Sequence, residues 1–142
     1  MLIRLLPDQV IKEWEVVKYA ISQANHEQLF ATEEGVKDHL RQVIAGVMHV
    51  WAIVQDDEFA GVAVTRFNTD QSVGVKRLEI YALFGFKVIK NKTWATCFVA
   101  LRRFAEAKNC SFIMALSDNQ AVLRLADKLG ADTEQRMIVF KI

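Results

Sequence analysis

Apolar residues near the start of the chain follow first a strand-like and then a helical spacing. Residues 2–5 form a short apolar run, and a helical stripe then begins at Pro7-Asp8 and continues to about Ala24. A second stripe occupies residues 32–46, where the hydroxyl of Thr32 can cap the first turn and a glycine ends the pattern. The pattern predicts one strand followed by two amphipathic helices.

From Met48 the spacing changes from helical to alternating. Residues 48–54 and 59–67 are two strand-like runs joined by a polar turn, which predicts a hairpin. Residues 75–86 form a run so long and so rich in β-formers that we expect a third strand. Three consecutive antiparallel strands are therefore expected.

The last third of the chain alternates between the two spacings. Residues 91–108 predict a helix, and residues 111–116 predict a buried strand parallel to the preceding one, reached by a right-handed crossover. Residues 120–129 predict a helix with Gly130 as its C-cap, and residues 137–142 alternate like a final strand.

The predicted order is β-α-α-β-β-β-α-β-α-β. It describes an α/β fold in which about four helices flank a mixed, mostly antiparallel sheet. No internal repeat or linker interrupts the chain, so we expect one domain over residues 1–142.

Composition and charge exclude several classes of protein. The chain is 52% hydrophobic and carries 18 basic and 17 acidic residues, so no overall field favours nucleic acid or an anionic membrane. The apolar start is too short for a signal peptide, and no later run approaches the ~18 residues of a membrane span, which predicts a cytoplasmic protein. Cys97 and Cys110 lack metal-ligand spacing and predict buried free thiols in a reducing compartment.

The other residues with chemical potential have structural explanations. His26, His39 and His49 lack the spacing of a metal pair or a catalytic triad, so we expect structural or surface roles and no metal site. The acidic residues 56–58 fill the predicted hairpin turn. Trp94 lies in the first turn of the helix at 91–108, where it can fill the space of a ligand.

Several sequence segments resemble the GCN5-related N-acetyltransferases (GNAT). The most specific segment runs from Asn119 to Gly130, where Leu125, Lys128 and Leu129 stand at the family's offsets from Asn119. Supporting phrases are Trp51-Ala-Ile-Val, Gly61-Val-Ala-Val and Phe104-Ala-Glu-Ala-Lys-Asn-Cys110. The resemblance implies the GNAT fold, acetyl-CoA as cofactor, and a small-molecule or protein amine as acetyl acceptor.

Two positions depart from the family's pattern. Ala126 occupies the offset of a tyrosine that the family uses to protonate the departing thiolate, and alanine has no proton to give. Tyr81 and Glu79, which alternation places on one face of the strand at 75–86, are the candidate catalytic replacements. The alternative is that both are ordinary strand residues.

The second departure lies before the helix at 91–108. The family binds a pyrophosphate there with a glycine-rich loop, whereas this chain has no glycine from Lys87 to Trp94. The candidate cofactor-binding residues are instead Lys87, Lys90, Asn91, Lys92 and Thr93, with Asn119 added by the resemblance. The alternative is a solvated basic loop without a cofactor.

Two hypotheses follow from the resemblance. One is a divergent acetyl-CoA-dependent N-acetyltransferase. The other is a non-catalytic GNAT-like protein that binds or assembles with other proteins. Small GNAT-like proteins with an eroded phosphate loop occur among phage-encoded proteins, which implies the host cytoplasm or a virion as location. The strand at 137–142 also offers an edge for a homo-oligomer.

Overall fold

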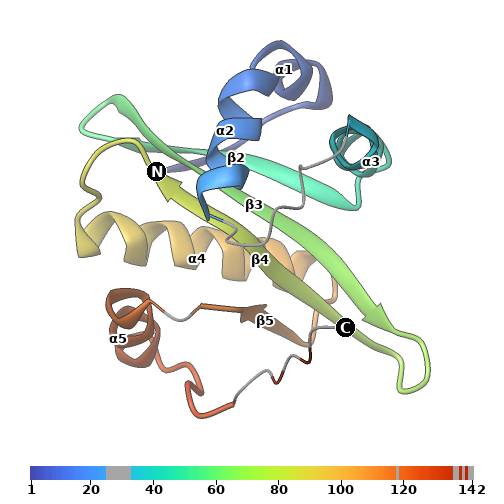
Figure 1. Ribbon diagram of the computed structural model, residues 1–142. Helices are drawn as coiled ribbons and strands as arrows, with labels where there is room; N and C mark the ends of the chain where they lie inside the picture. Colours follow the sequence, from blue (N-terminus) through green and yellow to red (C-terminus); the bar gives the residue numbers. More distant parts are fainter. Residues whose placement is uncertain (25–32, 118, 136–137, 139, 141–142) are drawn as a thin grey trace.

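The chain folds around one five-stranded sheet with helices on both faces (Figure 1). The computed structural model describes residues 1–24, 33–117, 119–135, 138 and 140. The elements are, in chain order, β1 (Leu2–Arg4), α1 (Pro7–Lys12), α2 (Trp14–Ala24), α3 (Glu33–Ile44), β2 (Met48–Gln55), β3 (Glu58–Asp70), β4 (Val75–Gly85), α4 (Asn91–Ala107), β5 (Phe112–Ala115) and α5 (Gln120–Lys128).

The strands lie in the sheet in their order along the chain. β1 to β4 are antiparallel neighbours, and β5 adds to β4 in parallel after the α4 crossover. The hairpin between β2 and β3 turns at Asp56 and Asp57, whose φ angles of 52° and 60° are typical of a tight turn that matches the twist of the strands. The predicted α/β class with a mixed, mostly antiparallel sheet is confirmed.

The first predicted helix is in fact two helices. Pro7 opens α1, and the backbone at Glu13 (φ −99°, ψ 20°) leaves helical geometry before α2 begins. The break lets Val10 of α1 and Val17 of α2 enter the same hydrophobic cluster. The described part of the chain therefore contains five helices where about four were expected.

Three predictions fall wholly or partly outside the described residues. His26 and the capping Thr32 are not described. Of the predicted strand at 137–142, only Ile138 and Phe140 are described; neither belongs to a strand, and they are 79% and 85% exposed. The described sheet therefore ends at β5.

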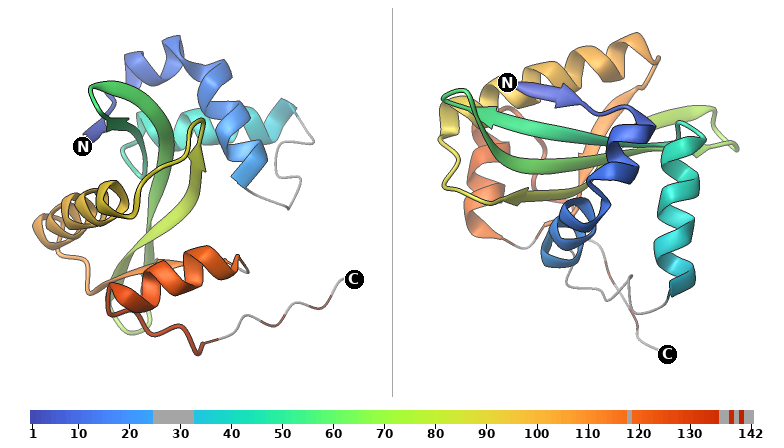
Figure 2. Two further views of the ribbon diagram at one scale, coloured as in Figure 1. Left: turned by 90° about the vertical axis from the view of Figure 1, so that its left-hand side faces the viewer. Right: turned by 90° about the horizontal axis from the view of Figure 1, so that it is seen from above.

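Each face of the sheet has its own hydrophobic cluster. Helices α1, α2 and α3 cover one face (Figure 2), where the cluster centres on Ile21, Met48 and Val64. Helix α4 covers the other face with Cys97 and Leu101, which pack on Trp51 and Ile53 of β2. Among the described residues, no helix is both long and apolar enough to cross a membrane.

His49 is an internal part of the sheet and has a structural role, as expected for it. Its ring lies 3.1 Å from Thr65 Oγ1 and 2.9 Å from the Gly46 carbonyl oxygen, and Trp51 Nε1 donates to the same Thr65 oxygen. Burial lowers the pKa of His49 from 6.5 to about 4, although the bond to Gly46 acts in the opposite direction. The imidazole is therefore neutral in the folded protein at neutral pH.

This histidine makes stability depend on pH in a defined window. Since its pKa is lower folded than unfolded, its contribution is complete above pH 6.5 and is lost as pH falls towards 4. We expect the free energy of unfolding to fall by about 2–3 kcal/mol across that window, and to fall less in His49→Gln. Urea denaturation at several pH values measures this. If the free energy of unfolding fell equally with pH in the wild-type protein and in His49→Gln, the prediction would be wrong.

Candidate functional site

Strands β4 and β5 pair only over part of their length and then separate. Their register ends at Ile80 opposite Ala115, whereas β4 continues to Gly85. The register between β3 and β4 shifts at the same level, which makes Tyr81 the extra residue of a β-bulge. Such a bulge increases local twist and bends the strand. The outer edge of β4 beyond Tyr81 is thus not covered by β5.

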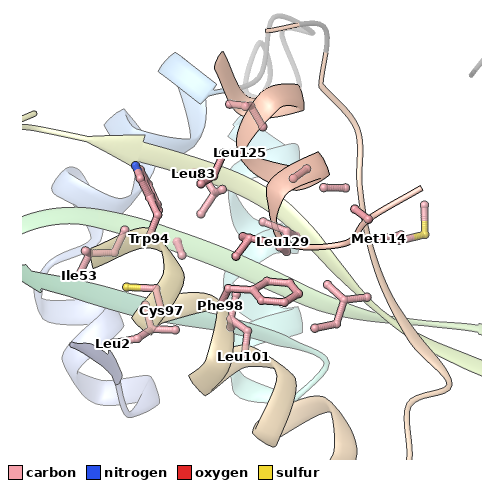
Figure 3. Close-up of a pocket in the computed structure, with 17 residues that line it drawn as sticks. Leu2, Ile53, Leu83, Trp94, Cys97, Phe98, Leu101, Met114, Leu125 and Leu129 are labelled. Atoms are coloured by element: carbon pink, nitrogen blue, oxygen red, sulfur yellow. The ribbon is translucent and has the colours of Figure 1, made fainter. Parts of the chain in front are cut away.

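An apolar cavity of about 160 Å³ lies beside this separation, between β4, β5, α4 and α5 (Figure 3). Leu125 and Leu129 of α5 face Phe98 and Leu101 of α4 across it. Its full lining comprises Leu2, Ile53, Ala63, Ile80, Leu83, Trp94, Cys97, Phe98, Leu101, Ile113, Met114, Ala115, Val122, Leu125, Ala126, Leu129 and Ala131. Burial raises the pKa of the Cys97 thiol, so this group stays neutral.

Gln55, the last residue of β2, occupies two of the donors at the start of α4. Its Oε1 accepts hydrogen bonds from the backbone N–H of Lys90 and from Thr93 Oγ1, both at 2.9 Å. Its Nε2 donates to the Val88 carbonyl oxygen at 3.1 Å. A neutral side-chain amide therefore lies where a helix N-terminus would otherwise attract an anion.

Two of the three predicted lysines are engaged by the same hairpin. Lys90 Nζ lies 3.2 Å from Asp56 Oδ2, and Lys87 pairs with Glu58. In the described part of the chain no ion pair is found for Lys92, which follows Asn91 at the start of α4. We define the hairpin clamp as the contacts of residues 55–58 with residues 87–93. The clamp replaces free positive charge with neutral pairs.

The glycines near the clamp serve packing. A Cβ on Gly61 would lie 2.5 Å from the Phe84 carbonyl oxygen, and one on Gly85 would lie 2.8 Å from the Lys87 carbonyl oxygen. Both would also touch the side chain of Ile89, which belongs to the cluster under α4. The loop folds back onto the sheet and offers no bare backbone for a diphosphate.

The two catalytic candidates lie on the face of the sheet that α1, α2 and α3 cover, opposite the cavity. Both carboxylate oxygens of Glu79 accept from Arg66, at 2.6 Å from Nε and 3.3 Å from Nη2. The Arg66 guanidinium also lies over the ring of Tyr81 at 4.6 Å, and the Tyr81 hydroxyl lies 3.3 Å from His39 Nε2. Glu79 and His39 are each 7% exposed. The structure thus joins the two candidates through Arg66.

Asn119, a candidate cofactor residue, caps α5. Its side-chain oxygen accepts from the backbone N–H groups of Ala121 at 2.9 Å and Val122 at 3.3 Å. At the other end Gly130 has φ +85° and, with Ala131, donates to the last turn, which closes the helix as predicted. Ala126, between these ends, lines the cavity.

Sequence reasoning missed Gln55, Arg66 and His39 as members of these sites. Gln55 looked like an ordinary turn residue, and the signal that could have singled it out was the acidic run directly after it, opposite a lysine-rich loop. His39 has a structural role here, as expected. Among the described residues, no three His, Cys, Asp or Glu side chains are grouped to hold a metal ion.

The fold is that of the GNAT acetyltransferases. An aminoglycoside acetyltransferase from an uncultured soil metagenomic sample superposes with a TM-score of 0.74 at 16% identity, covering 100% of this chain and 96% of that one. AAC(6')-Iy with the bisubstrate analogue CoA-S-monomethyl-acetylneamine gives 0.73 at 13% identity, covering 100% and 97%.

A predicted acetyltransferase from Clostridium acetobutylicum, solved with acetyl-CoA, gives a TM-score of 0.68 at 11% identity, covering 99% of this chain and 95% of that one. No family model matches the sequence, and no curated protein matches it either. At these identities the likeness shows the fold alone.

Coenzyme A fits this fold only in part. The separation of β4 from β5 and the apolar cavity leave room beside the sheet for a thioester arm. The start of α4 does not fit the diphosphate, because Gln55 holds the Lys90 amide and the Thr93 hydroxyl and carboxylates hold two of the lysines. The glycine-free loop adds a Cβ at every position from Phe86 to Lys90.

The capping role of Asn119 gives a prediction that separates it from cofactor binding. Asn119→Ala should lower the free energy of unfolding by about 1 kcal/mol, because two amides of the first turn lose their acceptor. Asn119→Asp keeps an acceptor oxygen and should retain most of that stability. Urea denaturation measures both variants, and unchanged stability of Asn119→Ala would contradict the capping role.

Proposed function

We propose that this chain is a non-catalytic GNAT-fold binding protein that does not use coenzyme A. The observation that carries the proposal is the position of Gln55, whose side chain takes the N–H of Lys90 and the hydroxyl of Thr93. An anion at this helix start would have to displace those bonds and the two ion pairs beside them. Ligand binding is therefore expected elsewhere in the fold.

The absence of a placed acid supports the same proposal. Ala126 lines the cavity at the position of the family's tyrosine and has no proton to donate. Glu79 is held by Arg66 through both carboxylate oxygens, which leaves it poorly suited as a general base. Tyr81 packs beside the α1–α3 cluster and not in the cavity lining.

A specific observation favours N-acetyl transfer as the second candidate. β4 and β5 separate directly after Ile80 and Ala115, and the apolar cavity lies beside the gap. Two solved structures of the same fold hold acetyl-CoA or a coenzyme A bisubstrate analogue, and another is named an aminoglycoside acetyltransferase. In this candidate function the thioester arm would lie in the cavity, and the amine would reach the gap between β4 and β5 from the opposite face, which carries Tyr81 and Glu79.

Calorimetric titration with acetyl-CoA tests the proposal. We expect no heat of binding from the full chain at millimolar ligand, because the Lys90 N–H and the Thr93 hydroxyl are already bonded to Gln55. Gln55→Ala frees these donors and should raise the affinity for inorganic pyrophosphate by about tenfold or more. Gln42→Ala, which removes a half-buried glutamine on α3 that donates to Asp38, is the matched control. Micromolar binding of acetyl-CoA by the wild-type chain would overturn the proposal.

A steady-state assay separates the two candidate functions. With acetyl-CoA and a panel of primary amines that includes an aminoglycoside, we expect no acetylation above the uncatalysed rate. If turnover appears, N-acetyl transfer is the correct function. Tyr81→Phe and Glu79→Gln then report whether these residues act, with Tyr19→Phe, an exposed tyrosine on α2, as the control for loss of a hydroxyl.

A further inference from the structure

The two helices beside β5 present apolar stripes to each other without closing the space between them. Trp94, Phe98 and Leu101 form the stripe on α4, and Val122, Leu125 and Leu129 form the stripe on α5 (Figure 3). These spacings place each set on one side of its helix. Packed stripes of this kind normally bury their members, and here a cavity separates them.

Helix α5 shows how incomplete this packing is. It has no buried residue, and Val122 in its apolar stripe is 36% exposed. Strand β5 beneath it has only four residues. Ala126, whose side chain is only a methyl group, lines the cavity together with Leu125 and Leu129. A larger side chain there would occupy part of the space.

The size and lining of the cavity define what it can hold. Its volume of about 160 Å³ is close to that of an engineered protein cavity of about 150 Å³ that binds benzene, but this cavity is partly open to solvent. Its lining contains no Asp, Glu, Lys or Arg, and the Cys97 thiol is neutral. A charged group would lose its hydration without gaining a partner.

We propose that this cavity binds a neutral hydrocarbon group of about the size of benzene. The inference rests on one part of the proposed function, namely that coenzyme A does not occupy this cavity. The hydrocarbon group replaces water against apolar side chains of α4 and α5, which supplies the driving force. Any charged part of the natural ligand stays outside the cavity.

Benzene and benzoate are the probes, because they share a ring and differ in charge. Benzene at millimolar concentration should raise the melting temperature of the full chain and shift the NMR signal of the Trp94 indole N–H. Benzoate should bind at least about tenfold more weakly. Ala126→Leu fills the cavity and should abolish both responses to benzene. Ala121→Leu, at an exposed position of α5 outside the lining, should retain them.

Any of the following results would overturn the inference: no response of the wild-type chain to saturating benzene, an equal response to benzoate, or an unchanged response in Ala126→Leu. A benzene response that disappears as the chain dimerises at higher concentration would show that a second copy fills the cavity, which also contradicts it. Acetyl-CoA binding that leaves the benzene response intact would overturn the proposed function alone, whereas no response to either ligand would overturn only the hydrocarbon site.

Discussion

Gln55 bonds through its side chain to the backbone N–H of Lys90, to the hydroxyl of Thr93 and to the carbonyl of Val88, and it does so from the far end of the β2–β3 hairpin. These bonds fix the loop between β4 and α4 against the sheet, with Asp56 and Glu58 neutralising the adjoining lysines. Exposed ion pairs contribute little stability by themselves, so the clamp depends chiefly on the amide of Gln55. The position that a diphosphate would need at the start of α4 is consequently occupied by contacts within the protein.

The polar candidate residues and the apolar cavity lie on opposite faces of the sheet. Polar residues gather on the face of α1–α3, where Arg66 bonds Glu79 and covers the ring of Tyr81. The face of α4 and α5 contains the apolar cavity. Transfer between a donor and an acceptor requires reacting groups within about 3–3.5 Å in the correct orientation. Here the polar groups bond to one another, and the cavity is lined by apolar side chains, as the proposed binding function requires.

The sequence predicted the five strands of the described sheet and most helices well, because alternating and helical spacings are local signals that burial on the sheet then enforces. The break at Glu13 was not predictable in this way, since the apolar spacing continues through it. The site was harder still. The missing glycines and Ala126 were visible in the sequence, but the clamp joins Gln55 to Thr93 across 38 positions, and only the fold brings them together. The same holds for Arg66 with Glu79.

A crystal structure of the chain, from crystals grown with saturating acetyl-CoA, tests the hairpin clamp most directly. The account predicts that Gln55 Oε1 remains bonded to the Lys90 amide and the Thr93 hydroxyl and that no diphosphate lies at the start of α4. A diphosphate bound there, with Gln55 displaced and Lys87 or Lys90 turned towards it, would contradict the account.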